Sequence, residues 1–476
     1  MKMLINGSLT DSLSGETMEI KNPYTGEVID TVPKAMAADI DAAITAACEG
    51  QKEWARVPLH ERVKVLLRFV ELVRENHESL AENLCRDNGK PYVQAYGEIG
   101  NLFVSVPAFC EKAKHYYEEV IPAGQEPGQE HTLQYVKREP VGVVLCVIPF
   151  NFPSNLMSQK VIPALLMGNA AIVLPPSGNP LTNMRLCQLL DEAGVPAGVI
   201  QCVTAPGAVK EAAVTDPRIG FISLTGSTEV GVHVAELAAK NLTPCALELG
   251  GNDPFIVFED ADLDIALSEV YPGRLVNAGQ ICCACKRFIV HRSVLDAFTE
   301  GVMKIAEGLK SEDPMRPETK FTCLINEAAA EEVERQVNMT VDQGARILVG
   351  GHRDGTKYEA TVLADVTPDM DIARDLEVFG PVIPIIPFET EDEAVAIANN
   401  SIYGLASCIF TENSRRIARM ASRLEAGDVI VNGASRLRTF EMPFGGWKMS
   451  GLGTEGVMCT FDEMTRTKVI VLKDML

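Results

Sequence analysis

The sequence lacks a long apolar run: nowhere in its 476 residues do 18 apolar residues follow one another. A membrane-spanning helix needs about 20 such residues. The first residues, MKMLINGSLTDSLSG, reach glycine and serine before any long apolar stretch, so no signal peptide is visible. These absences predict a cytoplasmic protein that does not enter a membrane.

The chain is also short of positive charge. It carries 43 Lys and Arg against 65 Asp and Glu, a formal net charge of −22. Proteins that bind nucleic acid need a clustered basic surface to meet phosphate groups, so this balance argues against that class. The thirteen cysteines show no pairing rhythm, and their odd number leaves at least one free thiol. We therefore expect a reducing compartment.

The order of apolar and polar segments indicates the fold class. After Pro140, short apolar runs bounded by glycine or proline alternate with helix-like stretches. A first series of runs covers 141–149, 171–174, 199–203, 220–224 and 245–249, and a second covers 254–258, 286–290, 382–388 and 428–432. Strands that alternate with helices predict a parallel sheet covered on both faces. The sequence therefore predicts an α/β protein of two halves, and its length allows about three domains.

The first chemical signal is the segment LTGSTEVG, Leu224 to Gly231, which follows a predicted strand and opens a predicted helix. Glycines let the backbone approach a phosphate, and the free amides of a helix N-terminus attract an anion. A plain strand-to-helix turn explains the same residues equally well, because small residues serve any tight connection. The segment gains weight only from other motifs.

Glu248 and Cys282 form the next signal. A carboxylate at a strand end and a cysteine among small residues can supply the general base and the nucleophile of acyl chemistry. Taken alone, each is also explained by a buried ion-paired acid and an ordinary core cysteine. The cluster Cys282 to Cys285 does not predict a metal site, because structural zinc needs a second ligand pair and none is evident.

Seven motifs together resemble the aldehyde dehydrogenase superfamily over essentially the whole chain. They are IPFNFP (148–153), LTGSTEVG (224–231), LELGGNDP (247–254), GQIC (279–282), EVFGPV (377–382), YGLA (403–406) and PFGGWKMSG (443–451). The resemblance implies a Rossmann-like cofactor domain, an α/β catalytic domain and a small β oligomerisation extension. It assigns residues 1–117 and 141–250 to NAD(P) binding, 251–453 to catalysis, and 118–140 with 454–476 to oligomerisation strands. Within these, 131–139 alternates like an edge strand, and the protein is expected to be a homodimer or homotetramer.

The resemblance also implies three catalytic roles. Cys282 would attack the aldehyde to form a thiohemiacetal, and Asn151 with the Cys282 backbone amide would stabilise its oxyanion. After hydride transfer, Glu248 would activate the water that hydrolyses the thioester. Relatives that pass the acyl group to coenzyme A typically lack this carboxylate, so a free acid is the expected product. Lys160 resembles a lysine proposed to assist proton transfer, or is a solvated surface lysine.

The cofactor site is implied in the same way. The resemblance assigns it the residues Ile148, Pro149, Phe150, Ser177, Gly226, Ser227, Gly231, Glu377 and Phe379. Phe379 is also explained by ordinary core packing. Where the family commonly has Lys-Pro-Ser-Glu, this chain has Pro175 to Gly178, so both the acid that repels a 2′-phosphate and the lysine that attracts it are missing. The expected cofactor is therefore NAD or NADP.

The substrate side is expected to be polar. Asn155 and Gln159 stand where relatives for apolar aldehydes carry bulky residues, and NFPSNL resembles lactaldehyde and non-phosphorylating glyceraldehyde-3-phosphate dehydrogenases. Arg436 and Arg438 suit an anionic group on the substrate, or they pair with surface carboxylates. Ile281, where relatives for phosphorylated trioses tend to have arginine, argues against glyceraldehyde 3-phosphate. A lactaldehyde, phosphonoacetaldehyde, sulfolactaldehyde or semialdehyde remains.

Three alternatives stay open at this point. The chain could oxidise neutral aliphatic aldehydes, or be a non-catalytic binding protein of the same fold, as the altered segment at Pro175 to Gly178 suggests. It could also act as a thiol hydrolase through Cys282 and Glu248 without a nicotinamide. Activity against a panel of aldehydes, with and without cofactor, separates these functions.

Overall fold

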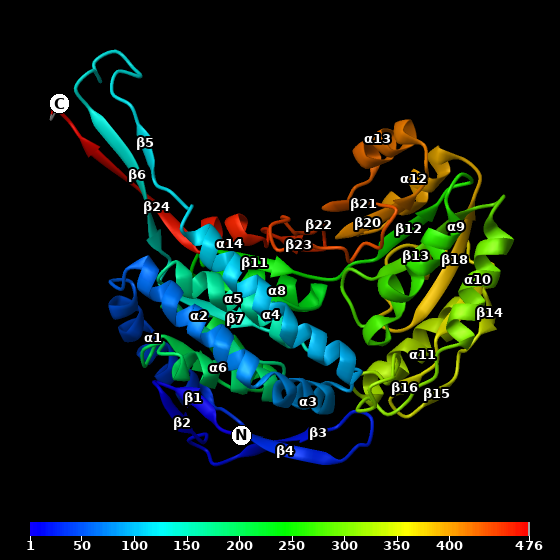
Figure 1. Cartoon of the computed structure of the whole chain (residues 1–476), viewed down its shortest axis with the longest axis horizontal. Coiled ribbons are helices and arrows are strands. Elements are labelled where there is room, and N and C mark those ends of the chain that lie inside the picture. The colour runs from blue at the N-terminus through cyan, green and yellow to red at the C-terminus, as the bar shows by residue number, and fades with distance from the viewer. Residues whose placement is uncertain (475–476) are drawn as a thin grey trace.

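The computed structural model describes residues 1–474 as two α/β lobes and a projecting β arm (Figure 1). The blue to green lobe holds an eight-stranded sheet, and the green to orange lobe holds a seven-stranded sheet. The chain passes between the lobes after strand β11 (Cys245–Glu248) and returns at strand β23 (Gly451–Leu452). The region between the two sheets is therefore built from loops that follow strands of both.

The first sheet has the order β2-β1-β9-β8-β7-β10-β11-β23. Its five central strands are parallel, and β1, β2 and β23 are antiparallel to their neighbours. The further bounds are Met3–Ile5 (β1), Ser8–Thr10 (β2), Val143–Val147 (β7), Ala170–Leu174 (β8), Ile200–Cys202 (β9) and Ile219–Thr225 (β10). These strands confirm the first series of apolar runs.

Helices cover both faces of this sheet, which explains why its strands are apolar throughout. Val144 and Cys146 of β7 belong to the core on one face, while Val143 and Leu145 belong to the core on the other. One face is covered by α2 (Leu59–Glu75), α3 (His77–Asn88), α4 (Tyr92–Ala113), α5 (Pro153–Leu166) and α6 (Leu181–Glu192). The other is covered by α1 (Ala37–Trp54), α7 (Gly207–Val214) and α8 (Thr228–Ala239).

The second sheet has the order β14-β17-β18-β13-β12-β20-β21. Its bounds are Asp253–Val257 (β12), Cys285–His291 (β13), Arg346–Val349 (β14), Thr361–Ala364 (β17), Val382–Phe388 (β18), Ala406–Phe410 (β20) and Asp428–Val431 (β21). The helices of this lobe are α9 (Leu263–Ser268), α10 (Leu295–Glu307), α11 (Glu327–Asp342), α12 (Glu391–Asn399) and α13 (Ser414–Arg423). The two-half α/β prediction is confirmed.

The β arm corrects one prediction. Segment 131–139 contributes β6 (Leu133–Pro140), which is the central strand of the arm and not an edge. It pairs on one side with β5 (Glu119–Ile121) and on the other with β24 (Thr465–Leu472) of the same chain. The partner strand lies more than 300 residues away in the sequence, so local alternation could not reveal it. Residues 475–476 of the predicted oligomerisation segment lie outside the described residues.

The smaller elements complete the description. Two-stranded sheets pair β3 (Thr17–Lys21) with β4 (Val28–Pro33), β15 (Arg353–Asp354) with β16 (Lys357–Tyr358), and β19 (Tyr403–Gly404) with β22 (Trp447–Lys448). The short helices are η1 (Tyr271–Leu275), η2 (Val276–Gly279), η3 (Asp371–Ala373) and α14 (Val457–Glu463). Within residues 1–474, no helix combines the length and the apolar character needed to cross a membrane. All thirteen cysteines are free thiols.

Candidate active site

A cavity of about 300 Å³ opens where the two lobes meet. Its wall contains Asn151, from the loop between β7 and α5, and Cys282, from the loop before β13. Glu248 is the last residue of β11 and directly precedes Leu249, which lines the cavity; Glu248 itself does not line it. Asn151 and Glu248 lie at the same edge of the first sheet, because its parallel strands end there. Cys282 comes from the second lobe, so Asn151 and Cys282 meet at one cavity with Glu248 next to its lining.

The loop that carries Cys282 has a strained backbone. Asn277, Ala278 and Gly279 take positive φ angles of 52°, 53° and 77° in succession, a left-handed turn that L residues rarely adopt. A Cβ on Gly279 would lie 2.4 Å from the Gly380 carbonyl oxygen, so glycine is required there. The buried guanidinium of Arg274 holds this turn against the second lobe by donating to the carbonyls of Val382 (2.7 Å), Val378 and Gly279.

The Cys282 thiol is not activated by its immediate surroundings. The hydrogen-bonded thiol of Cys283 and burial together raise the pKa of Cys282 well above its ordinary value, although the ammonium group of Lys286 opposes this. Lys286 is itself buried and donates to the Cys282 carbonyl oxygen at 2.5 Å. The nucleophile is the thiolate and not the thiol. A base within reach of Cys282 must therefore remove the proton.

Glu248 has the environment of such a base. It is 3% exposed, and neither carboxylate oxygen has a hydrogen-bond partner within residues 1–474. Burial and the neighbouring carboxylate of Glu455 raise its pKa well above the ordinary value, while Lys160 and Arg438 act in the opposite direction. An unpartnered buried carboxylate is costly and is expected where function requires it.

Lys160 is completely buried, so the prediction that it could be a surface residue is wrong. It donates to the buried carboxylate of Glu455 at 2.5 Å, and Arg438 approaches the same carboxylate at 3.6 Å. The Arg438 guanidinium also lies over the Phe444 ring. Sequence reasoning missed Glu455, which lies four residues after the last residue of the PFGGWKMSG motif (443–451). Arg438 therefore has a buried acidic partner, and its role toward a substrate stays a prediction.

Asn151 is held from both lobes. Its Nδ2 donates to the Gln280 carbonyl oxygen at 3.0 Å, next to the Cys282 loop, and its Oδ1 accepts from the Phe152 amide. The amide group has a second N–H. Asn151 makes no further side-chain donation within the described residues, so this N–H has no partner in residues 1–474.

The predicted cofactor residues fall into two groups. Pro149, Phe150, Gly226, Ser227, Glu377 and Phe379 line the cavity beside Cys282. Ile148 and Gly231 do not. Ile148 is buried beside β8, and a Cβ on Gly231 would lie 2.3 Å from Leu249, so Gly231 serves helix-to-strand packing. This is a structural requirement that the sequence pattern could not separate from phosphate binding.

A second cavity, of about 480 Å³, adjoins the first and shares Phe150, Glu377 and Phe379 with it. It extends to Ser177 and contains two buried oxygens without partners in residues 1–474, Asn179 Oδ1 and Gln336 Oε1. The two cavities thus form an elongated site that passes the N-terminus of α8, where Ser227 is the N-cap. An extended ligand with phosphates at its middle fits these residues, so the site suits a dinucleotide.

The residues predicted to contact the substrate place polar and charged groups at buried or partly buried positions. Asn155 and Gln159 lie one turn apart on α5, and Asn155 Oδ1 and Gln159 Oε1 are both buried without a partner in the described chain. Arg436 donates to the Pro272 carbonyl at 3.0 Å and has no acidic group within 4.0 Å among residues 1–474. Arg436 directly follows Ser435, whose hydroxyl donates to the Cys283 carbonyl oxygen at 2.8 Å, so Arg436 lies near the predicted nucleophile.

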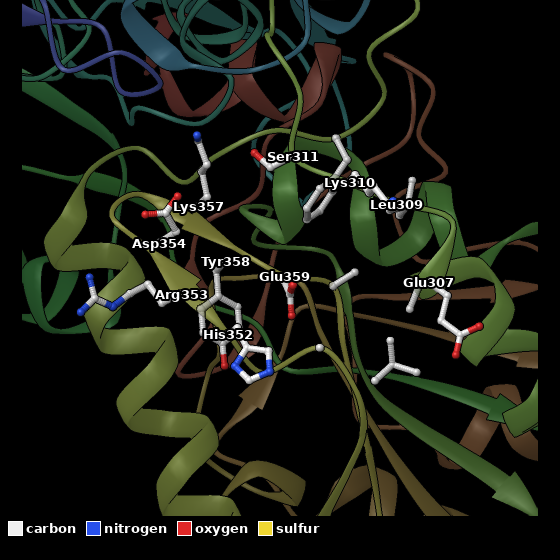
Figure 2. A pocket seen from close by; sticks show the side chains of 15 residues that line it. Glu307, Leu309, Lys310, Ser311, His352, Arg353, Asp354, Lys357, Tyr358 and Glu359 are labelled. Carbon is white, nitrogen blue, oxygen red and sulfur yellow. The ribbon is translucent and has the colours of Figure 1, made fainter.

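Another hollow, of about 460 Å³, lies in the second lobe between the end of α10 and the β15–β16 hairpin (Figure 2). His352, Tyr358 and Glu359 line its floor, and Lys310 and Ser311 line one rim (Figure 2). None of the predicted site residues lies there. The chemistry therefore concentrates in the cavity beside Cys282.

The comparisons with known proteins identify the family of this chain. The Aldehyde dehydrogenase family matches residues 9–470. Mitochondrial succinate-semialdehyde dehydrogenase of Arabidopsis thaliana is 38% identical, covering 99% of this chain and 89% of that protein. The 3-sulfolactaldehyde dehydrogenase of Pseudomonas putida is 37% identical, covering 98% of this chain and 96% of that protein. The NADP complex of NADP-dependent glyceraldehyde-3-phosphate dehydrogenase from Bacillus halodurans superposes with a TM-score of 0.96 at 34% identity, covering 99% of both chains. The chain therefore belongs to the aldehyde dehydrogenase family and is an aldehyde dehydrogenase that uses NAD or NADP.

Proposed function

We propose that the protein oxidises a small anionic or hydroxylated aldehyde to the carboxylic acid, with Cys282, Asn151 and Glu248 as its catalytic residues. The observation that carries this proposal is one cavity lined by Asn151 and by Cys282, which follows a strained turn. The buried carboxylate of Glu248, without a partner in residues 1–474, directly precedes the lining residue Leu249. Strain and unsatisfied burial at one place are typical of active sites.

In the first step, Cys282 Sγ forms a bond to the carbonyl carbon, and the carbonyl oxygen takes the electron pair. The second N–H of Asn151 Nδ2 and the backbone N–H of Cys282 stabilise this oxyanion, as preorganised donors do in acyl transfer. Glu248 accepts the thiol proton, which is needed because Cys283 and burial raise the pKa of Cys282. The adduct on Cys282 is a thiohemiacetal.

When bound, NAD or NADP supplies the acceptor for the hydride that leaves the thiohemiacetal carbon. Ser227 at the α8 N-terminus would hold the phosphates, and Glu377 and Phe379 would hold the nicotinamide end. Glu377 is fixed for this role, because it accepts from the Gly251 amide at 3.1 Å and pairs with Lys286 at 3.2 Å.

The last step releases the acid. Glu248 removes a proton from water, whose oxygen attacks the thioester carbon, and the Cys282 sulfur leaves as a thiolate. Lys160 and Glu455 are buried beside Glu248, and their charges act on it in opposite directions. Together with Arg438 they keep the neighbouring charge balanced while Glu248 gains and loses a proton.

Arg436 is proposed to select the substrate. It is a partly buried cation near Cys283 without an acidic partner in the described chain, and two relatives are named for aldehydes that carry a carboxylate or sulfonate. Arg436→Ala should raise KM for succinate semialdehyde by about 10- to 100-fold and leave KM for propanal unchanged, because bonds to charged groups are worth about 1.5–3 kcal/mol. Steady-state kinetics with both aldehydes measure this.

Arg438→Ala is the matched comparison. Because Arg438 faces Glu455, its removal should lower kcat for both aldehydes without a selective change in KM. Equal increases in KM for the charged and the neutral aldehyde in Arg436→Ala would contradict the anion site and favour neutral aliphatic substrates.

Lys210 is proposed to favour NADP. It lies on α7, and its ammonium group donates to the Pro175 carbonyl oxygen at 2.9 Å, two residues from Ser177 of the cofactor cavity. Burial lowers its pKa to about 8, and it forms no ion pair within residues 1–474. A lysine from α7 thus stands beside the segment that lacks the family lysine, and Gly178 carries no acid to repel a 2′-phosphate.

Calorimetric binding of nucleotide fragments tests this preference. Lys210→Met should weaken binding of 2′,5′-ADP by about 10-fold and leave 5′-AMP unchanged, since a charge-assisted hydrogen bond to phosphate is lost. Arg415→Met, an exposed change on α13, is the control. The same loss for both nucleotides would show that Lys210 acts on the shape of the site and not on the phosphate.

We also infer a cytoplasmic homodimer or homotetramer in which the arm of residues 118–140 and 454–476 contributes to contacts between subunits. Exposed Val469 and Val471 on β24 support this, because apolar side chains on a projecting sheet are a solubility hazard unless they are covered. Residues 1–117 and 141–250 would bind the cofactor, and 251–453 would carry the catalytic cysteine. The mass in solution, compared with the 51.6 kDa of one chain, tests the assembly.

A further inference from the structure

The backbone around Asn151 is held by a separate segment, residues 88–98, that the proposed mechanism does not use. Asn88 Nδ2 donates to the Phe150 carbonyl oxygen at 2.7 Å, and Lys90 Nζ donates to the Asn151 carbonyl oxygen at 2.6 Å. Glu98 Oε1 accepts from the Ser154 amide at 2.9 Å, at the start of α5. This segment therefore contacts the peptide groups on both sides of the Asn151 side chain.

Lys90 and Glu98 form a buried ion pair. Lys90 Nζ lies 2.6 Å from Glu98 Oε2, and the two residues are 1% and 3% exposed. Lys90 also lies over the Phe152 ring, 4.1 Å from its centroid. A buried ion pair is weak evidence for stability, because removing two charges from water costs about as much as their attraction returns. A role in fixing a specific geometry explains the pair better than stability does.

The contact at the Asn151 carbonyl joins this pair to the Cys282 loop. The same oxygen also accepts from Asn277 Nδ2 at 3.2 Å, and Asn277 is the first left-handed residue of that loop. The backbone N–H of Asn277 in turn donates to Gln94 Oε1, and Gln94 lies in the first turn of α4. The backbone carbonyl oxygen of Asn151 therefore accepts hydrogen bonds from the buried Lys90 and from Asn277 of the Cys282 loop. This one oxygen connects the Asn151 loop, the Cys282 loop and the Lys90–Glu98 ion pair.

We propose that Lys90, held by Glu98, is a positioning residue that fixes the Asn151 side chain for its donation to the oxyanion. The inference rests on the proposed role of Asn151. An oxyanion donor is effective only when it is already oriented before charge develops, and a displacement of about 1 Å can cost about 100-fold in rate. Lys90 touches neither substrate nor cofactor in this scheme and acts only through the Asn151 peptide group.

The test is a double-mutant cycle with a neutral pair. Lys90→Met alone would leave Glu98 as an uncompensated buried charge without the bond from Lys90 to Asn151. The paired change Lys90→Met with Glu98→Gln removes both charges and keeps an oxygen that can accept from Ser154. Glu98→Gln alone is the comparison, because it retains the bond from Lys90 to Asn151; it leaves Lys90 as the uncompensated buried charge, so its melting temperature is measured with its rate. Lys90→Gln with Glu98→Gln is a second variant with a polar end, for the case in which the Met pair does not fold.

The measured quantities are the single-turnover rate of thiohemiacetal oxidation, the affinity for NADP and the melting temperature. The paired variant should lose about 10- to 100-fold in rate relative to Glu98→Gln and keep the same NADP affinity. In an Asn151→Ala background, the same paired change should cost less than about 3-fold, because its effect passes through Asn151. A merely structural role would lower the rate by the same factor in both backgrounds.

Two results separate the possible failures. If Asn151→Ala itself leaves the single-turnover rate unchanged, the oxyanion role of Asn151 is wrong. If Asn151→Ala lowers the rate but the neutral pair is as fast as Glu98→Gln, or costs the same factor in both backgrounds, the positioning role of Lys90 is overturned while the proposed function stands.

Discussion

Cys282→Ser should lower the rate of aldehyde oxidation by about 10⁴-fold or more, because an alcohol at this position cannot supply the thiolate that forms the thiohemiacetal. Cys282 lines the cavity together with Asn151 and follows the strained turn of residues 277–279. Formation of NADPH or NADH with a suitable aldehyde measures the loss. The folded state should be retained, because Cys282 is only partly buried and serine is smaller than cysteine.

Cys283→Ser is the matched control for this prediction. Cys283 is the adjacent thiol and shares the same surroundings, and its sulfur contributes to the raised pKa of Cys282. We expect this variant to retain activity within about 10-fold. If Cys283→Ser is inactive and Cys282→Ser is active, the nucleophile has been assigned to the wrong thiol.

Glu248→Gln should separate the two halves of the reaction. Without the carboxylate, hydrolysis of the thioester slows by about 10²- to 10⁴-fold, the range typical of a lost general base. A first turnover of reduced cofactor should still appear, but more slowly than in the wild type, because the Cys282 thiol proton must then pass to solvent instead of Glu248. A much slower steady state should follow, because the acyl group stays on Cys282. Stopped-flow absorbance records both phases. Glu236→Gln, an exposed acid on α8, should behave like the wild type.

The pH profile adds a second measurement on the same residue. Burial and Glu455 raise the pKa of Glu248, and the base acts in its ionised form. The steady-state rate should therefore increase with pH through a midpoint above the ordinary glutamate value, and this dependence should disappear in Glu248→Gln. A profile unchanged by the substitution, or a steady state slowed no more than the first turnover, would contradict the assignment of Glu248 to hydrolysis.

The roles predicted for Cys282, Glu248 and Asn151 rest on seven motifs that together resemble one family. Taken alone, Glu248 and Cys282 are also explained by a buried ion-paired acid and a core cysteine. The strands of both sheets follow the apolar runs because they are buried on both faces, so their composition is distinctive.

The contacts that tune the site are not predictable in this way. Lys160 and Glu455 are almost 300 residues apart, and Lys90 reaches Asn151 across 61 positions. Charged residues in a sequence usually indicate solvent exposure, so nothing local marks these as buried pairs. Arg438 is a similar case. Its side-chain type suggests an anion site, but in the folded chain it approaches the buried carboxylate of Glu455. The prediction that segment 131–139 is an edge strand is wrong for the same reason, because β6 also pairs with β24, which is distant in the sequence.

The most direct test of the account is to trap the acyl enzyme. Glu248→Gln is mixed with succinate semialdehyde and NADP or NAD, quenched in acid, digested and examined by mass spectrometry. The account predicts that the succinyl group is found as a thioester on Cys282, in an amount that matches the first turnover of reduced cofactor, and that none forms without cofactor. Reduced cofactor without an acyl group on Cys282, or an acyl group on Cys283, would contradict it.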